Sequence, residues 1–307
     1  MSVYNLGGGT LSDVYNKAGT SLNSAYNKSG NVVFTKGQVI DYTSYSYTQK
    51  WASKGVGSTQ GFAIYDGKVF WISKSGNSTV PANCYVWNLN DGSQALSSQP
   101  ITVQTGHGNS IDMDSTTMYS ATAYSGGNVY INSFSNDFLT NTLVKTLALP
   151  TSSDNTTAHG CDACLDENDK SILWSIHHTV ALTDRDTPWE IRKWDLDNLT
   201  DNGDGTYTPQ CLQTVSVAQP ANSPYFQGCA FHDGIFWYAN GYSDSSGAYV
   251  FGVNPNTGEY LYTIDCESTT EPEGVYWLAD ENADGGYAMY VGFYGMMLRK
   301  YTFYYAS

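Results

Sequence analysis

Five polar residues stand directly before a glycine at the start of similar stretches of this 307-residue chain. We call them the opening residues: Gln60, His107, His159, Gln227 and Glu273. Their amide, imidazole and carboxylate groups include both donors and acceptors, so together they could hydrogen-bond a polar ligand such as a sugar. The glycine after each of them lets neighbouring backbones approach closely. The spacing and chemistry of these residues predict a polar binding site, provided that the fold brings them together.

Each opening residue begins a pattern typical of a β-hairpin. In the clearest copy, an apolar strand at 229–231 is followed by an Asp233-Gly234 turn and an aromatic-rich strand at 235–239. The opening residues lie 47, 52, 68 and 46 residues apart. Four-stranded units repeated at a period of about 50 residues are typical of propeller blades. The sequence therefore predicts an all-β chain folded as a five-bladed β-propeller.

The fifth unit has one strand too few. Its third strand is expected at 297–303, and the sequence stops at Ser307. The β-rich stretch 38–51 can supply the missing strand and close the ring, which would protect the sheet edges. We therefore expect the propeller to span residues 37–307. Residues 1–36 carry two Tyr-Asn-Lys-x-Gly units at a period of 11 and are predicted to be a short stem or linker for attachment or oligomerisation, with a flexible tail as the alternative.

The composition excludes several classes of partner. The chain carries 29 acidic against 14 basic residues, a net charge of −15, and has no block rich in Lys or Arg. Long-range repulsion therefore argues against binding to nucleic acid or to an anionic membrane surface. The first residues have no basic region followed by an apolar run, so no secretory signal peptide is expected. No stretch approaches the length of a membrane span.

The six cysteines do not predict a disulfide scaffold or a metal centre. Cys161 and Cys164 form a lone Cys-x-x-Cys pair, but residues three apart in a strand point to opposite faces, which prevents joint ligation. Cys161 and Cys229 each follow an opening residue by two positions and are expected to be small buried residues. Neither a metal nor any other cofactor is predicted.

In a propeller the first strand of each blade lines the central axis, so the opening residues should meet at one mouth of that axis. Three further residues are expected to join this ligand-binding site: Glu271, Asp162 and Tyr225. Glu271 and Asp162 would add carboxylates, and Tyr225 could stack on a sugar ring. The alternative interpretation is that the polar side chains only hydrogen-bond adjacent loops.

Catalysis is the rival hypothesis for the same site. Glycoside hydrolases use paired carboxylates at a defined separation. Glu273, Asp162 and Asp112 could form such a set, although Asp112 and Asp162 occupy different positions within their repeats. The chain contains no Gly-x-Ser-x-Gly nucleophile elbow. Binding is favoured over hydrolysis, and the chain is not predicted to be an enzyme.

Several of these motifs resemble those of a known family. They are Gln60-Gly61-Phe62, Gly106-His107-Gly108-Asn109-Ser110-Ile111, Tyr225-Phe226-Gln227-Gly228 and Glu271-Pro272-Glu273-Gly274-Val275-Tyr276. Across residues 58–307 they look like the blade motifs of five-bladed receptor-binding proteins at the tail tip or tail fibre of phages that infect Gram-positive bacteria, staphylococcal phages in particular. The Tyr-Asn-Lys-x-Gly units are similar to linkers in phage tail proteins.

The resemblance implies a function in host adsorption. It implies binding to a bacterial surface glycan or a teichoic-acid-like cell-wall polymer, contacts with other tail or baseplate proteins, and a virion location with an extracellular role. By analogy, the chain would be a homotrimer joined through its N-terminal segment. Two alternatives remain open: a glycoside hydrolase or lyase acting on a surface polysaccharide, and a scaffold propeller that binds a protein.

Overall fold

The structure is a computed structural model, and it describes residues 40–74, 81–122, 127–149, 161–178, 186–221, 225–242 and 247–305. It also describes four short strands nearer the N-terminus: β1 (Val14–Tyr15), β2 (Ser21–Leu22), β3 (Ser24–Tyr26) and β4 (Val32–Thr35). β1 pairs with β2, and β3 pairs with β4. In sequence, the Tyr-Asn-Lys-x-Gly units lie between the paired strands. A separate role for residues 1–36 stays a prediction.

The remaining strands follow one another in successive antiparallel groups of four. The first group contains β6 (Thr59–Tyr65), β7 (Lys68–Ser73), β8 (Ala82–Asn88) and β9 (Ile101–Val103). The second contains β10 (Ser110–Asp114), β11 (Thr117–Ala121), β12 (Asn128–Ser135) and β13 (Thr140–Ala148). The third contains β14 (Cys161–Leu165), β15 (Ile172–His177), β16 (Trp189–Asp201) and β17 (Thr206–Val217). The fourth contains β18 (Phe226–His232), β19 (Ile235–Asn240), β20 (Tyr249–Val253) and β21 (Tyr260–Asp265).

The last group combines strands from both ends of the chain. It contains β22 (Pro272–Ala279), β23 (Tyr287–Phe293), β24 (Met297–Tyr305) and the early strand β5 (Ile40–Trp51). β5 pairs antiparallel with β24, from Trp51 opposite Leu298 to Ile40 opposite Tyr305. The side chain of Tyr42 on β5 is buried and makes edge contacts with four aromatic rings: Trp237, Tyr262, Trp277 and Phe303. β5 is therefore part of the folded core.

The prediction of an all-β chain is confirmed. Among the described residues there is no α-helix, and the single helical element is the short 3-10 turn Asp284–Gly286. None of the described segments is a helix that could cross a membrane.

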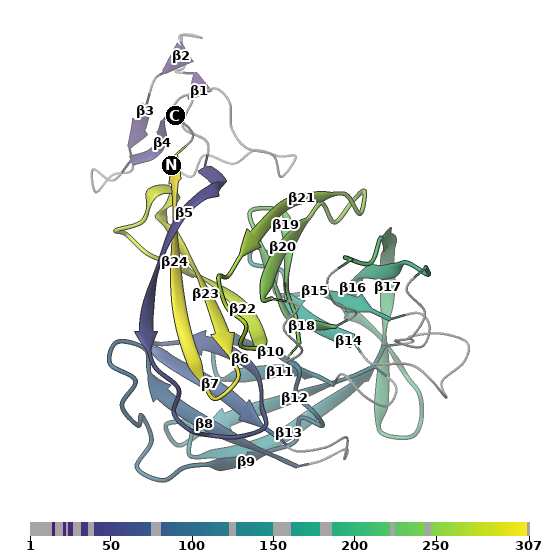
Figure 1. The fold of residues 1–307 in the computed structure, drawn as a ribbon. Helices are drawn as coiled ribbons and strands as arrows, with labels where there is room; N and C mark the ends of the chain where they lie inside the picture. Colours follow the sequence, from purple (N-terminus) through teal and green to yellow (C-terminus); the bar gives the residue numbers. More distant parts are fainter. Residues whose placement is uncertain are drawn as a thin grey trace.

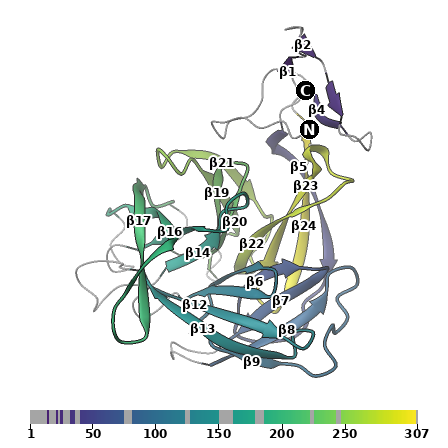
Figure 2. The same ribbon diagram turned by 180° about the vertical axis from the view of Figure 1, so that it is seen from behind.

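The first strands of the groups contact one another in a closed cycle. β6 contacts β10, β10 contacts β14, β14 contacts β18, β18 contacts β22, and β22 contacts β6. Figures 1 and 2 show the groups arranged around this centre from opposite sides. Gln60, Gln227 and Glu273, near the starts of β6, β18 and β22, therefore lie on strands that contact one another.

The predicted hairpins at 225–241 and 60–71 are confirmed. β18 and β19 are joined at Asp233 and Gly234, which have φ angles of 54° and 72°. β6 and β7 are joined at Asp66 and Gly67, with φ angles of 49° and 68°. Two successive residues with positive φ form the turn that matches the twist of a hairpin, and Asp-Gly tolerates this conformation.

The core is divided into clusters of buried side chains that lie between successive groups. Phe70 and Met118 pack between the first and second groups, and Leu147 and Leu173 between the second and third. Other clusters lie between the third and fourth, the fourth and fifth, and the fifth and first groups. Each group therefore buries both faces against its neighbours, which favours the mostly apolar inner strands seen here.

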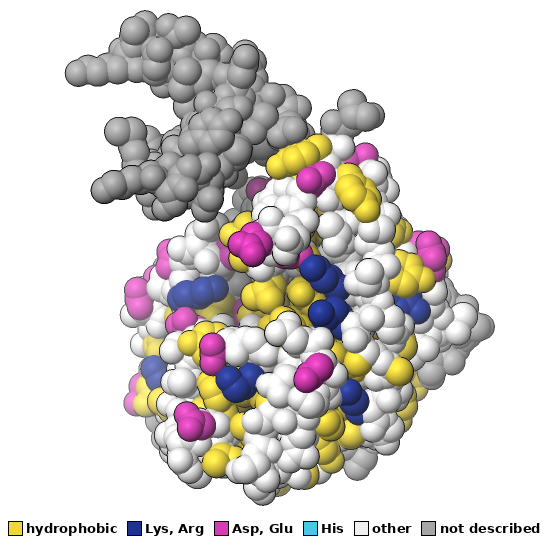
Figure 3. Space-filling model, turned by 90° about the vertical axis from the view of Figure 1, so that its left-hand side faces the viewer, with side chains coloured by type: hydrophobic (Ala, Val, Ile, Leu, Met, Phe, Trp, Pro, Cys, Tyr) yellow, Lys and Arg dark blue, Asp and Glu magenta, His cyan; other side chains and the backbone are white. Residues whose placement is uncertain are grey.

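The third group is longer than the others because β16 and β17 form an extended hairpin. Its turn contains Gly203 and Gly205, with φ angles of 77° and 87°. The hairpin reaches the second group, where Thr206 pairs with Thr146 in a short parallel contact between β17 and β13. On the face drawn in Figure 3, acidic and basic side chains are interspersed.

Candidate functional site

The opening residues begin, or directly precede, the first strands of the groups. Gln60 lies in β6, Gln227 in β18 and Glu273 in β22. His107 precedes β10 in a loop and is half-buried. The carbonyl of Gly108, the next residue, accepts a hydrogen bond of 3.0 Å from the backbone N–H of Gly61, which places the His107 loop beside the start of β6. His159 lies outside the described residues, so its position in the site stays a prediction.

The glycines that follow the opening residues lie where backbones meet. A Cβ on Gly61 would lie 2.6 Å from the carbonyl oxygen of Asn109, and a Cβ on Gly228 would lie 2.8 Å from the Cα of Gly274. Gly228 also has a φ angle of 75°, which other residues rarely adopt. The close backbone approach expected from the sequence is confirmed at Gly61 and Gly228.

Gln227, Glu271, Glu273 and Thr59 form a polar group, which we call the rim cluster. The amide Nε2 of Gln227 donates a hydrogen bond of 2.6 Å to Oε1 of Glu271. The hydroxyl of Thr59 donates a longer bond of 3.4 Å to Oε1 of Glu273. Glu273 and Gln227 are buried, with 2% and 7% of their surfaces exposed, whereas Glu271 is only half-buried. The accessible carboxylate of the cluster is therefore that of Glu271.

The two glutamates of the rim cluster have different surroundings. Burial raises the pKa of Glu273 well above its usual range, and the negative charge of Glu271 raises it further. The hydrogen bond from Thr59 lowers the pKa only in part. Glu273 therefore holds its proton at pH values where an exposed carboxyl has lost it.

Partly exposed tyrosines lie on chain segments next to the rim cluster. On one side the rings of Tyr225 and Tyr242 lie 4.9 Å apart, and 43% of Tyr242 is exposed. The neighbouring residue Gly241 approaches Pro272, which stands between the two glutamates of the cluster. On the other side Tyr294 is 45% exposed, and its backbone N–H donates to the carbonyl of Glu271 at 2.8 Å. The segments that carry Tyr242 and Tyr294 therefore adjoin the segment that carries the two glutamates.

The sequence analysis placed Tyr225 at this surface but did not single out Tyr242 or Tyr294. Tyr242 directly follows the Asn240-Gly241 end of β19, and Tyr294 lies in the turn between β23 and β24. The sequence signal that could have identified them is an aromatic residue beside a glycine at the end of a strand. Tyr294 also organises the loop before β6, since its hydroxyl accepts a bond of 3.1 Å from the backbone N–H of Ser58.

Asp162, a predicted ligand-binding residue, lies inside the molecule with none of its surface exposed. Its carboxylate accepts bonds of 3.0 and 3.2 Å from the Asn109 amide and one of 2.6 Å from the backbone N–H of Gly228. Burial raises the pKa of Asp162 to about 7, although these bonds lower it in part. Asp162 therefore links the second, third and fourth groups and does not reach the surface of the rim cluster.

Asp112, the third carboxylate in the set for the catalytic alternative, also accepts hydrogen bonds inside the molecule. It accepts bonds from the backbone N–H groups of Met113 and Leu165 at 2.7 and 2.9 Å. The structure therefore separates the proposed set of Glu273, Asp162 and Asp112 into one rim residue and two internal ones. These internal bonds satisfy carboxylates that would otherwise be buried without partners.

The cysteine pair does not form a metal site. Cys161 packs in the core cluster between the second and third groups, whereas Cys164 packs between the third and fourth. The predicted opposite orientation of the two side chains is confirmed. Among the described residues no group of three or more histidine, cysteine or acidic side chains is arranged to hold a metal ion.

Neither a family model nor a curated protein sequence matches this chain. Among solved structures it is similar to the tail fibre of Staphylococcus aureus phage P68, with a TM-score of 0.47, 14% identity, and coverage of 86% of this chain and 53% of the other. It is also similar to a GH43 glycoside hydrolase engineered to display endo-xylanase and exo-arabinofuranosidase activity, with a TM-score of 0.46, 10% identity, and coverage of 84% and 52%.

A third similar structure is the WD40 β-propeller domain of Doa1, with a TM-score of 0.38, 12% identity, and coverage of 84% of this chain and 97% of that domain. A phage tail fibre and a β-propeller are thus among the structures that this chain resembles. The chain spans about half the length of the tail fibre and the hydrolase. At TM-scores of 0.47 and below, none of these likenesses assigns a function.

Proposed function

We propose that the chain is a five-bladed β-propeller spanning residues 37–307, with residues 1–36 as a separate stem. The proposal is supported by the closed cycle of contacts among β6, β10, β14, β18 and β22. It is also supported by core clusters between each group and the next, including the one between the fifth group and the first. In this arrangement the pairing of β5 with β24 completes the last blade and closes the ring.

We further propose that the surface around the rim cluster binds a glycan. The observation that carries this proposal is the hydrogen-bonded pair Gln227 and Glu271, together with the partly exposed Tyr242 and Tyr294 on segments that adjoin residues 271–272. Sugar hydroxyls both donate and accept, so an amide beside a carboxylate can bind them in pairs. Tyrosine rings provide flat apolar surface together with a polar hydroxyl, which suits the apolar face of a sugar ring.

The glycan is proposed to be a host cell-surface polymer, and the protein a receptor-binding protein of a phage tail. The blade motifs named in the sequence support this assignment, as do the Tyr-Asn-Lys-x-Gly units. A virion location, contacts with other tail or baseplate proteins and a homotrimer belong to the same proposal. Because Glu271 is accessible and the chain carries a net charge of −15, the bound part of a teichoic-acid-like polymer would be its neutral sugars rather than its phosphates.

The experiment is a binding assay on purified cell wall from Gram-positive hosts. Glu271→Gln and Tyr294→Ala should each weaken binding by roughly tenfold, because each removes a direct contact from the centre of the interface. Tyr304→Ala is the matched control, since Tyr304 is similarly exposed, at 42%, but lies on β24 away from the rim cluster. Unchanged binding in both rim variants would count against the proposal.

Glycoside hydrolysis is the second candidate, and one observation favours it. Glu273 has a raised pKa beside Glu271, and a proton-holding carboxyl next to a second carboxylate is the pairing used by glycosidases. However, Glu273 is only 2% exposed, so a glycosidic oxygen could reach it only if the rim rearranged. Release of reducing sugar from a polysaccharide panel, abolished by Glu273→Gln, would establish hydrolysis, whereas wall binding without sugar release favours adhesion.

A further inference from the structure

A concave site lies at the opposite end of the inner strands from the rim cluster, where the hairpins turn. It is a pocket of about 190 Å³. Its lining comes from β5, from the turns after β14 and β18, and from the start of β23: Ile40, Tyr42, Glu167, Asn168, His232, Asp233, Gly285 and Tyr287. Along β18, His232 lies roughly 17 Å from Gln227, so the pocket is separate from the rim cluster. Its size suits one ring or an end group rather than the larger ligands that fill pockets of about 300–1,000 Å³.

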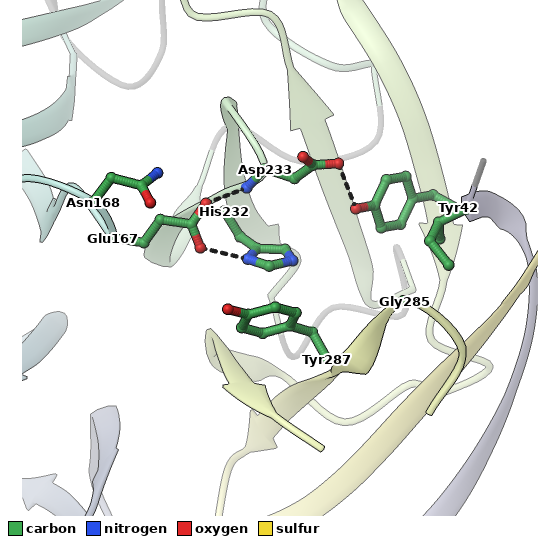
Figure 4. Close-up of a pocket in the computed structure, with 8 residues that line it drawn as sticks. Tyr42, Glu167, Asn168, His232, Asp233, Gly285 and Tyr287 are labelled. Atoms are coloured by element: carbon green, nitrogen blue, oxygen red, sulfur yellow. Dashed lines mark hydrogen bonds and ion pairs between the residues drawn. The ribbon is translucent and has the colours of Figure 1, made fainter. Parts of the chain in front are cut away.

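Hydrogen bonds among the residues that line the pocket occupy their donor groups (Figure 4). The hydroxyl of Tyr42 donates to Oδ2 of Asp233 at 3.0 Å, and the backbone N–H of Asp233 donates to Oε1 of Glu167 at 2.6 Å. Nδ1 of His232 lies 2.6 Å from Oε2 of Glu167. Burial opposes ionisation of Glu167, but the bond to His232 and the charge of that ring outweigh it, so the pKa of Glu167 is lowered. Glu167 is therefore a carboxylate, which can only accept, and Nδ1 must donate.

This bond fixes how His232 presents its other nitrogen. Because Nδ1 donates to Glu167, the imidazole ring is held in one orientation with Nε2 on its other edge. The side chain of His232 is only 7% exposed, and its ring is held between Trp277, at 4.4 Å between centroids, and Tyr287, at 4.5 Å. Within the described part of the chain Nε2 has no hydrogen-bond partner, and it points away from Glu167 toward the side of Tyr42 and Gly285 (Figure 4). Nε2 of His232 therefore faces the pocket without a partner among the described residues.

The lining therefore offers more acceptors than donors. The carboxylates of Glu167 and Asp233 each keep lone pairs beyond the bonds they accept. Asn168 and Tyr287 can serve in either role, and the ring of Tyr287 adds a face that attracts cations. Two carboxylates with a single histidine leave the pocket negative. A ligand complementary to this lining would carry a positive charge and several hydrogen-bond donors.

We propose that this pocket binds a primary ammonium group, which carries three donors, no acceptor and a positive charge. The ammonium could belong to an amino sugar or to a lysine side chain, since both present the same chemistry to the pocket. The inference goes beyond the proposed function, because the site lies at the other end of the inner strands and uses none of the rim cluster. It holds whether or not the rim binds a glycan.

The test is ligand-observed NMR on the full chain with three probes. Glucosamine and the methyl ester of Nα-acetyl-lysine each carry an ammonium group, and N-acetylglucosamine is the neutral control. We expect one or both ammonium probes to bind and N-acetylglucosamine not to compete with them. Binding of glucosamine alone assigns the source of the ammonium as a glycan amine. Binding of the lysine derivative alone assigns it as a protein side chain. Absence of binding by both, or equal binding of the neutral sugar at the same site, would overturn the proposal.

Two variants test whether the NMR binding signal arises from the pocket. Asp233→Asn removes the charge and keeps the size, and asparagine tolerates the φ angle of 54° at this position. We expect it to weaken ammonium binding by about tenfold, because hydrogen bonds to charged groups are roughly twice as strong as neutral ones. Asp197→Asn, in an exposed part of β16, is the control for net charge and should bind as the unmodified chain does. Equal affinity of the two variants would contradict the assignment.

Discussion

Single residues at the centre of the molecule serve packing and hydrogen bonding more than ligand contact. Asp162 was predicted to add a carboxylate to the ligand-binding site, yet its carboxylate is bonded internally to Asn109 and Gly228. Sequence spacing could place it on an inner strand but could not show which way its side chain points. Conversely, Tyr242 and Tyr294 were missed because an exposed tyrosine and a core tyrosine look alike in a sequence this rich in aromatics.

The raised pKa of Asp162 predicts a dependence of stability on pH. Its folded pKa of about 7 lies above the value of about 3.9 expected in an unfolded chain. Between these values the folded form binds more protons than the unfolded form, so the contribution of Asp162 to stability is present below pH 4 and is lost as the pH rises toward 7. Urea unfolding should show Asp162→Asn gaining stability relative to the unmodified chain over this range, by up to about 4 kcal/mol. If the difference in unfolding free energy between the variant and the unmodified chain stays constant over this pH range, the raised pKa of Asp162 is contradicted.

Gly228 and Gly203 offer a matched test of close packing at the centre. They have similar φ angles, 75° and 77°, but a Cβ on Gly228 would lie 2.8 Å from Gly274 whereas Gly203 has open space around it. Gly203→Ala should cost about 1 kcal/mol of unfolding free energy from backbone strain alone. Gly228→Ala should cost at least about 3 kcal/mol because overpacking adds to the strain. Equal losses in urea unfolding would show that the centre is not tightly packed.

At the scale of elements, the hairpins were predictable because each carries its own turn chemistry. Asp66-Gly67 and Asp233-Gly234 both adopt the positive φ angles that the sequence signal implies. The pocket at the turn end was not predictable, because its residues come from turns far apart in the sequence and none of these turns is unusual by itself. Tyr42, Glu167 and Asp233 meet only once the groups are packed side by side.

Two truncations test the contribution of β5. A chain beginning at residue 40 keeps β5 and should retain a cooperative thermal transition close to that of the full chain. A chain beginning at residue 52 loses the buried Tyr42 and Trp51 and exposes the edge of β24. Loss of each large aromatic from a core costs about 3–5 kcal/mol, against a typical total stability of about 5–15 kcal/mol.

The shorter chain should therefore unfold or aggregate, since an unpaired edge strand also promotes association. Circular dichroism and size-exclusion chromatography on both truncations would show the difference. A well-folded monomer beginning at residue 52 would contradict the proposed role of β5 in completing the last blade.

At the scale of the whole molecule, the charge of −15 predicts how salt affects binding. An acidic protein and an anionic wall polymer repel each other, and added salt screens this repulsion. Binding to cell wall should therefore stay constant or strengthen as sodium chloride rises, if the rim contacts neutral sugars. Binding that falls steeply with salt in a sedimentation assay would indicate contacts between phosphates and basic side chains instead.

The central claim is that a glycan binds over the rim cluster, between its flanking tyrosines. The most direct measurement is a crystal structure of the chain with an oligosaccharide released from host cell wall. We predict that a sugar ring lies against Tyr242 or Tyr294 with hydroxyls bonded to Gln227 and Glu271. An oligosaccharide bound only in the pocket at the turn end, or on the outer strands with the rim empty, would contradict the account.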